Sequence, residues 1–279
     1  MSDFTANYHT HTTYCDGKSS PEEIASEAVS LGMTEIGFSG HSYTSIDESY
    51  CMSREGMREY FDKTGKLREE YDGRIKILRG IEMDYFSDPE DYEYGWDFII
   101  GSCHYIKKDG EIFPVDESEE ILMDACERLY GGDIYSLIAD YYKEVGDVAD
   151  VVRTGCIKAG SSVDAKLIIG HFDLITKFNE GGKLFDERDP RYVEAWMSAL
   201  DILTKDKSLI FEINTGAMSR GYRKAPYPSE DILTELARRG ASVILSSDSH
   251  EKTTLMYGFD EADALAEKAG LTPLQTLPR

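Results

Sequence analysis

All six histidines of this chain follow apolar runs that have the composition of β-strands. His9 and His11 end the first run, and the other four follow later runs one at a time. The carboxyl ends of parallel strands gather at one edge of a sheet or at the mouth of a barrel, so the pattern predicts that the histidines meet at one site. The later histidines are His41, His104, His171 and His250.

Strand-like and helix-like runs alternate along the whole sequence. Because no Pro/Gly/Ser-rich linker, internal repeat or low-complexity tract interrupts them, we expect one α/β domain, residues 1–279, with a parallel sheet. Ligand-type side chains at the end of nearly every strand favour a closed barrel, since the strand ends of an open sheet diverge. The seven expected strands are residues 5–9, 35–40, 75–82, 97–103, 166–170, 208–214 and 242–247.

Helix boundary signals are clearest between the first two strands. Ser20 is the expected N-cap, Glu23 completes a capping box with it, and Gly32 is placed to end the helix. Further helices are expected from an N-cap at Ser229 to Gly240, over 53–71 and 190–205, and as two or three helices within 116–160.

The composition is strongly acidic, with 53 acidic and 30 basic residues and a net charge of −23. Such a surface repels nucleic-acid phosphates and anionic membranes, so we expect neither as a partner. No apolar run reaches the ~18 residues of a membrane span, and the first residues lack the pattern of a signal peptide. The five cysteines contain no C-x-x-C pair, which indicates reduced thiols and a cytoplasmic location. The sequence does not indicate the oligomeric state.

His9-x-His11 is the sharpest local motif. In a strand, side chains at i and i+2 point the same way and lie about 6.6 Å apart along the chain, which suits two imidazoles on one cation. Asp248-x-His250 repeats this spacing after the seventh strand. A mixture of imidazole and carboxylate without thiolate suits zinc, manganese or iron, and the sequence does not choose among them.

Other roles are open for some of these residues. His104 could be a hydrogen-bonded core histidine, His171 could form a structural pair with Asp173, and Asp16 could be only a turn residue. Glu82 ends an apolar run, where an unpaired carboxylate is costly to bury, so a cation partner is favoured. The candidates exceed the four ligands of a structural zinc site, so we expect a catalytic site of two or three ions. They are His9, His11, Asp16, His41, Glu82, His104, His171, Asp248 and His250.

The ordered set of ligands resembles the PHP (polymerase and histidinol phosphatase) superfamily. The resemblance runs from about residue 7 to residue 258 and is closest to the histidinol-phosphate phosphatase branch. The motifs are His-Thr-His-Thr-x-Tyr-Cys-Asp-Gly at 9–17, Gly-His-Phe-Asp-Leu-Ile-x-Lys-Phe at 170–178, Glu-Ile-Asn-Thr at 212–215 and Tyr-Pro-Ser at 227–229.

The resemblance implies a distorted seven-stranded (β/α) TIM-like barrel with three divalent transition-metal ions at its mouth. Asp16 stands where many relatives outside the phosphatase branch have histidine, which favours that branch. Ser249 replaces the usual alanine, a change that does not affect ligation. The implied ligand sets are His9, His11, Glu82 and Asp248 for the first ion, Asp16, His41 and His250 for the second, and Glu82, His104 and His171 for the third.

A phosphate ester also needs fixed cations. Arg220 and Arg223 follow the sixth strand on the functional side of the barrel, and guanidinium groups bind phosphate oxygens in pairs. We expect Arg220 to matter more and Arg223 to lie nearer solvent. The alternative is that both belong to a solvated basic loop. Arg153 and Lys177 are further candidates for binding the substrate.

Other phosphatase chemistries lack their motifs in this sequence. There is no C-x5-R, no Asp-x-Asp-x-Thr/Val, no Arg-His-Gly and no P-loop, which leaves attack by a metal-bound hydroxide. Together with the resemblance, this leads us to expect hydrolysis of the small-molecule ester L-histidinol phosphate in histidine biosynthesis, with a hydroxide bridging two ions. The catalytic candidates are Asp16, Asp248 and His250.

Two alternatives remain open at this point. One is a PHP phosphoesterase that acts on a nucleotide, an oligonucleotide or a phosphotyrosine peptide. The other is a barrel that binds metal without turnover, although the complete ligand set argues against it. Asp47, Glu48 and Asp84 are candidate partners for the amine of histidinol, and the sequence does not select one.

Overall fold

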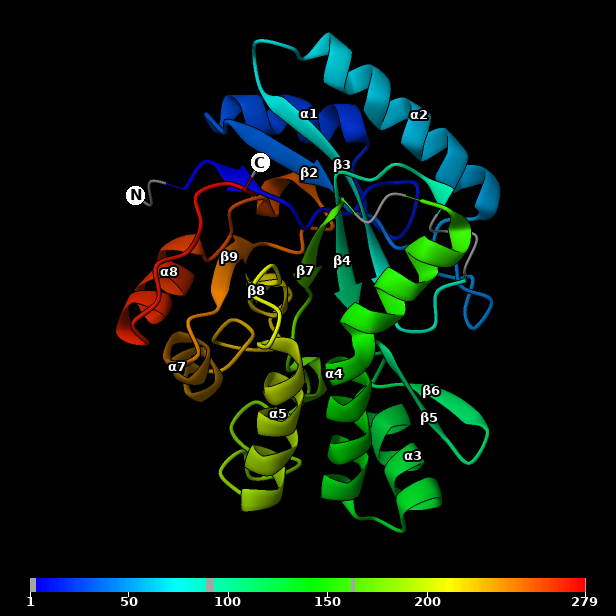
Figure 1. Cartoon of the computed structure of the whole chain (residues 1–279), viewed down its shortest axis with the longest axis vertical. Helices are drawn as coiled ribbons and strands as arrows, with labels where there is room; N and C mark the ends of the chain where they lie inside the picture. The colour runs from blue at the N-terminus through cyan, green and yellow to red at the C-terminus, as the bar shows by residue number, and fades with distance from the viewer. Residues whose placement is uncertain (1–3, 89–92, 162–163, 279) are drawn as a thin grey trace.

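Seven parallel strands form a nearly closed barrel (Figure 1). The computed structural model describes residues 4–88, 93–161 and 164–278. All seven expected strands are confirmed, and their ends lie within two residues of those expected. Along the sheet they are β1 (Ala6–Asn7), β2 (Glu35–Phe38), β3 (Lys76–Asp84), β4 (Phe98–Ser102), β7 (Lys166–Ile169), β8 (Ile210–Asn214) and β9 (Ser242–Ser246).

The barrel closes through the residues that follow its first and last strands. Thr10 pairs with Ser249 in a parallel bridge, and the backbone N–H of His11 donates to the Ser249 carbonyl at 2.8 Å. This bridge brings the His-x-His motif directly beside the Asp-x-His motif. The expectation of a barrel whose strand ends converge is therefore confirmed.

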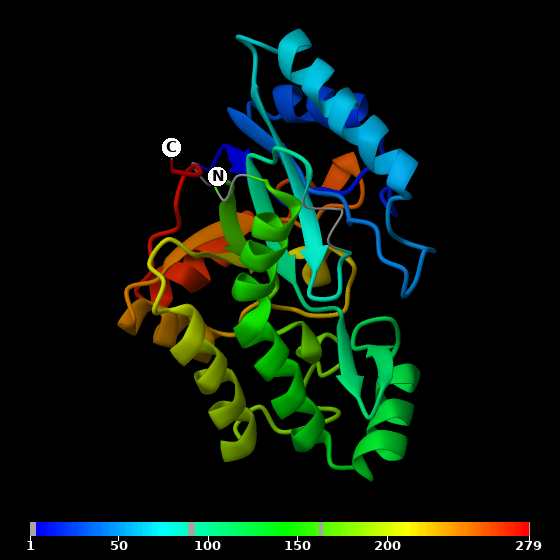
Figure 2. The same cartoon turned by 45° about the vertical axis from the view of Figure 1, so that its right-hand side comes forward.

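The C-terminal segment covers the gap between β1 and β9 at the opposite end of the barrel. Leu274 forms a parallel bridge with Ile244, and the Leu277 N–H donates to the Tyr8 hydroxyl at 3.1 Å. The described ends of the chain accordingly lie close together in both views (Figures 1 and 2). The last residues of the chain are thus part of the barrel's packing.

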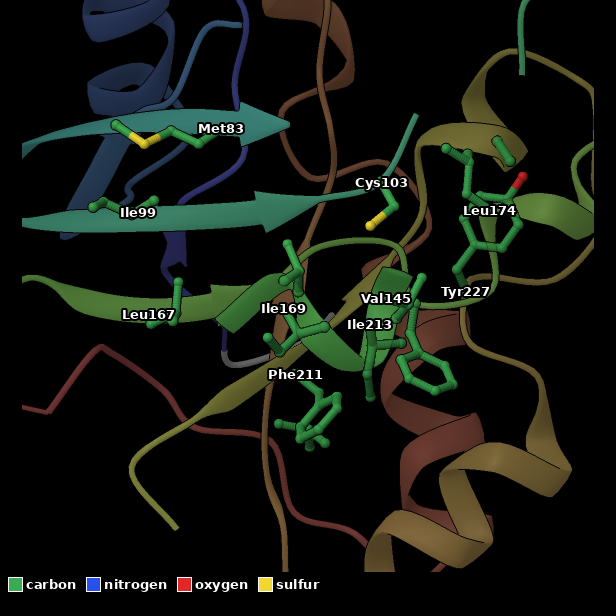
Figure 3. Close-up of a cluster of buried hydrophobic side chains, with 14 of the residues drawn as sticks. Met83, Ile99, Cys103, Val145, Leu167, Ile169, Leu174, Phe211, Ile213 and Tyr227 are labelled. Atoms are coloured by element: carbon green, nitrogen blue, oxygen red, sulfur yellow. The ribbon is translucent and has the colours of Figure 1, made fainter. Parts of the chain in front are cut away.

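Strand residues alternate between the barrel interior and the layer beneath the helices. Phe98 and Ile100 belong to the interior cluster, whereas Ile99 belongs to the outer one, as the period of two requires. The Phe98 ring fills the space beside Gly80, where an added Cβ would lie 2.2 Å from Phe98 Cζ. The outer cluster joins β3, β4, β7 and β8 to α4 (Figure 3). Its members in that view include Met83, Ile99, Val145, Leu167, Ile169, Phe211 and Ile213.

Helices follow the strands as the alternation predicts. The region 116–160 holds two of them, and α4 packs lengthwise against α5 (Figure 2). None of the described helices is both long enough and apolar enough to cross a membrane. The α-helices are α1 (Pro21–Ser30), α2 (Arg54–Glu70), α3 (Glu119–Tyr130), α4 (Ile134–Ala159), α5 (Pro190–Leu203), α6 (Gly216–Ser219), α7 (Glu230–Arg238) and α8 (Phe259–Lys268), with short 3-10 turns η2 (Leu174–Thr176) and η3 (Lys252–Thr254).

The expected helix caps are confirmed in position. Glu23 N–H donates to Ser20 Oγ at 3.3 Å, and Ser20 N–H donates to the Glu23 carboxylate at 2.9 Å, which completes the capping box. Ser229 precedes α7, but its side chain makes no capping bond. Its backbone N–H instead donates to the Asp173 carboxylate at 3.0 Å, which ties the start of α7 to the loop after β7.

Several elements were not expected from the sequence. They are the antiparallel hairpin of β5 (Tyr105–Lys108) and β6 (Glu111–Pro114), the short helix α6, α8 and the two 3-10 turns. The hairpin turns at Asp109 and Gly110, which both have positive φ, and Asp-Gly is a typical sequence for such a turn. Because the hairpin begins directly after His104, it contributes side chains to the barrel mouth.

Candidate metal centre and its cavity

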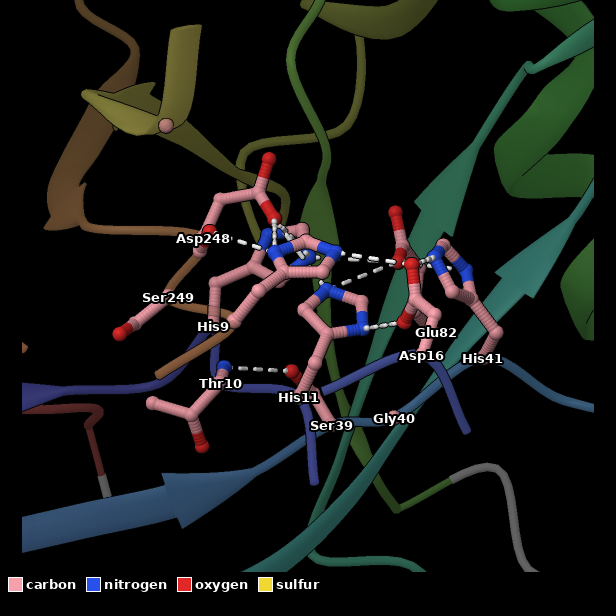
Figure 4. A network of polar contacts seen from close by, with 12 residues as sticks. His9, Thr10, His11, Asp16, Ser39, Gly40, His41, Glu82, Asp248 and Ser249 are labelled. Carbon is pink, nitrogen blue, oxygen red and sulfur yellow. Dashed lines mark hydrogen bonds and ion pairs between the residues drawn. The ribbon is translucent and has the colours of Figure 1, made fainter. Parts of the chain in front are cut away.

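All six histidines lie in one cluster at the mouth of the barrel, and Figure 4 shows part of it. The rings of His11 and His250 stack with centroids 4.1 Å apart, although these residues stand at opposite ends of the sequence. The His104 and His171 rings lie 4.8 Å apart. The structure therefore brings together the histidines that the sequence placed on separate strands.

Glu82 occupies the centre of this cluster. It projects inward from β3, is 1% exposed, and accepts a hydrogen bond from Ser102 Oγ at 2.7 Å. Each of its two oxygens faces a different group of imidazoles. Oε2 lies 3.0 Å from His41 Nδ1, 3.3 Å from His9 Nε2 and 3.6 Å from His11 Nε2, whereas Oε1 lies 3.0 Å from His171 Nε2 and 3.5 Å from His104 Nε2.

Asp248 and Asp16 complete the cluster on the side nearer the cavity. Asp248 Oδ1 lies 3.2 Å from His11 Nε2, and Asp248 has a φ of 47°, a conformation that non-glycine residues rarely adopt and that often marks functional sites. Asp16 Oδ2 lies 3.0 Å from His250 Nε2 and 3.9 Å from His41 Nε2. Asp16 is also in a turn, so its two expected roles are compatible.

Several buried ligand atoms have no hydrogen-bond partner in this arrangement. They include His9 Nε2, His11 Nε2 and Glu82 Oε2, and leaving such a group unsatisfied costs about 1–3 kcal/mol. A cation between these atoms would remove that cost, so the donor set fits divalent metal ions. Three groups have ligand atoms within 4.8 Å of one another: His11, Asp16, His41 and His250; His9, His11 and Glu82; and His41, Glu82 and His104.

Carboxylates control the charge of these histidines when no metal is bound. Burial acts to lower the pKa of His9, but the charges of Glu212, Glu82 and Asp248 outweigh it and raise that pKa to about 10. Burial likewise opposes the ionisation of Glu82, yet the imidazoles hold its pKa well below the ordinary value. In His250, by contrast, burial and the nearby His11 lower the pKa. A metal ion that binds here would therefore displace protons from part of the cluster.

Two carboxylates behind the ligands were not recognised from the sequence as partners of the histidines: Glu212 was given no role, and Asp84 was named only as a candidate partner for the amine. Glu212 Oε2 lies 2.8 Å from His9 Nδ1, and its Oε1 accepts from the His171 backbone N–H at 2.5 Å. Asp84 Oδ2 lies 3.2 Å from His104 Nδ1 and accepts from the backbone N–H of His104 at 2.7 Å. Such carboxylates orient metal-binding histidines. In a strand, side chains two residues apart face the same side. Glu212 therefore faces inward like Ile210, and Asp84 faces inward like Glu82, which the sequence could have indicated.

A cavity of about 350 Å³ opens over the cluster, and Arg220 forms part of its wall. Arg220 Nη2 donates to Asp248 Oδ2 at 2.9 Å, and Nη1 donates to the Asp248 carbonyl at 3.0 Å. The guanidinium and carboxylate approach closely over Gly216, where an added Cβ would lie 2.7 Å from Asp248 Oδ2. Arg220 thus connects α6 to a candidate ligand at the floor of the cavity.

The other basic candidates occupy different environments. Lys177 lines the cavity, and its Nζ donates to the Asp116 carbonyl at 2.6 Å and carboxylate at 3.0 Å. Arg223 does not line the cavity, because its Nη1 donates to the Thr176 carbonyl and to Glu187, each at 3.1 Å. The expectation that Arg223 lies nearer solvent is wrong, since its side chain is 12% exposed and that of Arg220 is 30% exposed.

Arg153 lies away from this cavity as well. It belongs to α4, pairs with Asp206, and lines a separate hollow together with Cys156. The structure therefore brings two of the four expected basic residues, Arg220 and Lys177, to the cavity.

This chain resembles known proteins in both sequence and fold. The sequence matches the PHP domain over residues 7–216. A Deinococcus radiodurans protein named "Probable histidinol-phosphatase" is 30% identical over 268 residues, which cover 93% of this chain and 90% of the relative. A Listeria monocytogenes structure has a TM-score of 0.75 at 22% identity and covers 92% of this chain and 99% of that chain.

A Lactococcus lactis histidinol phosphate phosphatase, solved with zinc, L-histidinol and phosphate, has a TM-score of 0.65 at 21% identity and covers 99% of both chains. At these identities the two structural likenesses show a shared barrel fold. The sequence match extends over most of the chain and includes most of the clustered side chains. This chain belongs to the PHP domain family.

Proposed function

We propose that this protein is a metal-dependent phosphomonoesterase that hydrolyses L-histidinol phosphate to L-histidinol and phosphate in histidine biosynthesis. The observation that carries the proposal is the cluster of unpaired, buried ligand atoms at the floor of a cavity of about 350 Å³. That volume suits a small phosphate ester. The names of the similar proteins support histidinol phosphate as the ester.

We assign three divalent ions to the cluster, and zinc, manganese or iron suits its ligands. The zinc of the Lactococcus lactis protein supports a zinc-type ion here. The position of Glu82 is an argument for more than one ion, because its two carboxylate oxygens face different imidazoles. The proposed sets are His9, His11, Glu82 and Asp248; Asp16, His41 and His250; and Glu82, His104 and His171.

When bound, these ions supply positive charge for the phosphoryl oxygens and lower the pKa of coordinated water. Asp16, Asp248 and His250 are the proposed catalytic residues, and all three line the cavity together with other members of the cluster. The lowered pKa of His250, which results from burial and from His11, keeps a nitrogen lone pair available near neutral pH.

Arg220 has the geometry of a transition-state binder. Its two bonds to Asp248 hold the guanidinium in place before the substrate arrives, so little reorganisation is needed when negative charge grows on the phosphoryl group. Lys177 adds a second positive charge on the wall, although Asp116 offsets part of it. Arg223 and Arg153 have protein partners elsewhere, and we assign them no contact with the substrate.

We place the protein in the cytoplasm as a single domain that has neither nucleic-acid nor membrane partners. The net charge of −23 supports the absence of polyanionic partners, since it repels nucleic acids and anionic lipids. All five cysteines are free thiols in the structure, which supports a reducing compartment.

A panel of phosphomonoesters assayed with metal-reconstituted protein tests the proposed function. We expect the kcat/KM for histidinol phosphate to exceed that for p-nitrophenyl phosphate by at least ~10²-fold, because binding of the alcohol group contributes to the rate with a preferred substrate. A higher kcat/KM for nucleotides, oligonucleotides or phosphotyrosine peptides would instead identify this chain as a PHP phosphoesterase with another substrate.

A further inference from the structure

The cavity over the candidate metal centre has a lining of mixed chemistry. Arg220 and Lys177 line it, and so do Tyr222, whose ring lies 5.0 Å from Lys177 Nζ, and two further tyrosines, Tyr50 and Tyr105. The Tyr50 ring meets the His41 ring edge-on, with centroids 4.8 Å apart and an interplanar angle of 89°. Tyr105 lies beside Tyr50. The centroids of these two rings are 6.4 Å apart, and the angle between the ring planes is 29°. An aromatic wall therefore leads from the metal ligands into the rest of the cavity.

The cavity lining also includes carboxylates without a basic partner. Asp47 and Glu117 line the cavity, and neither forms an ion pair within the described part of the chain. The backbone N–H of Ser49 donates to Asp47 Oδ1 at 2.9 Å, which fixes this carboxylate on its loop. Asp116, which also lines the cavity, is already paired with Lys177. The negative charges of Asp47 and Glu117 are thus left for a cation from outside the protein.

The three acidic residues that were candidate partners for an amine have different surroundings in the structure. Asp84 is engaged with His104 behind the metal ligands, and Glu48 accepts a hydrogen bond from the Tyr43 hydroxyl at 2.7 Å. Neither of them lines the cavity, whereas Asp47 does. Of these three carboxylates, Asp47 is therefore the one that a ligand cation inside the cavity can contact.

We propose that Asp47, with Glu117 and the rings of Tyr50 and Tyr105, forms a subsite for a cationic group on the alcohol side of the ester. This inference rests on the proposed function and assigns the residues that distinguish its substrate. A phosphoryl group is repelled by the two carboxylates and attracted to Arg220, so the ester enters in one orientation. An ammonium group is stabilised by the Asp47 carboxylate and by the faces of the aromatic rings.

Two substrates that differ only in the amine test the subsite. These are histidinol phosphate and 3-(imidazol-4-yl)propyl phosphate, which lacks the amino group. We expect Asp47→Asn to lower the ratio of their kcat/KM values at least tenfold. Glu48→Gln removes the same charge one residue away, and there the ratio should change by less than twofold. Glu117→Gln should shift the ratio in the same direction but less, because its side chain is exposed.

Product inhibition gives a second measurement in the metal-loaded protein. In Asp47→Asn, the ratio of the inhibition constant of L-histidinol to that of inorganic phosphate should rise at least tenfold. Unchanged ratios in both Asp47→Asn and Glu117→Gln would overturn the subsite while the proposed function stands. If the unmodified protein does not prefer the amine-bearing ester, the proposed substrate is wrong and the subsite falls with it.

Discussion

Glu212 and His9 form a fully buried pair in which the carboxylate oxygen lies 2.8 Å from the imidazole Nδ1. The other ring nitrogen of His9, Nε2, faces Glu82 and has no hydrogen-bond partner. The same Glu212 carboxylate accepts the backbone N–H of His171. One residue of β8 therefore orients candidate ligands that follow two other strands.

Glu212→Gln should weaken metal binding about 10–100-fold, the usual effect of removing a carboxylate behind a metal-binding histidine. The amide keeps the size of the side chain but not its charge, so the pKa of His9 should fall as well. Chelator competition would measure the metal affinity, and NMR of the metal-free protein would follow the imidazole. Glu267→Gln, at an exposed position of α8, is the control. Equal affinities in the two variants would show that Glu212 only fills space.

Metal binding should strengthen as the pH rises. In the metal-free protein the cluster's carboxylates, acting against burial, raise the pKa of His9 to about 10 and that of His104 to about 9. These imidazoles are protonated at neutral pH, and an ion must displace their protons in order to bind. For each proton that binding releases, the metal affinity should rise about tenfold per pH unit until the pH reaches the raised pKa of that histidine. Chelator-buffered titrations between pH 6.5 and 8.5 would measure the slope, and a flat profile would contradict the assignment.

Arg220→Ala should reduce kcat/KM by an amount equivalent to about 2–4 kcal/mol of transition-state stabilisation. Arg220→Lys should restore part of the loss, because it returns the charge without the paired donors. Arg223→Ala is the control from the same loop. Its bonds to Glu187 and the Thr176 carbonyl predict a lower Tm with little change in rate. Steady-state kinetics would measure the effect on rate, and thermal unfolding would measure the effect on stability. Equal, small losses of rate in Arg220→Ala and Arg223→Ala would mean that the metals and Lys177 bind the phosphate without Arg220.

Leu277→Ala should destabilise the fold by about 2–5 kcal/mol, the range for removing a buried leucine side chain. Leu277 is 5% exposed and packs in the barrel's interior cluster near the chain's C-terminal end. Leu31→Ala, at a leucine that is 48% exposed, should have a much smaller effect. Denaturant unfolding would compare them. Similar midpoints for both variants would mean that the C-terminal segment does not stabilise the barrel.

The sequence by itself determined which segments are strands and which residues are candidate ligands. Both are local properties: a period of two places His9 and His11 on one face, and each later histidine follows its own apolar run. The capping box at Ser20 and Glu23 was predictable for the same reason, because its bonds span only three residues. Strand ends of a parallel barrel converge, so these local patterns were enough to predict that the candidate ligands meet at one site.

The tertiary structure decided every feature that depends on contacts between distant residues. Arg220 and Arg223 are nearly equivalent in sequence, yet Asp248 draws one to the cavity and Glu187 holds the other away from it. Glu212 became part of the cluster only when β8 was packed between β7 and β9, from where its side chain reaches His9. Leu277 became a barrel residue only when the chain end reached Tyr8. Which carboxylate meets which cation is fixed by packing across the barrel, and no local period in the sequence encodes that choice.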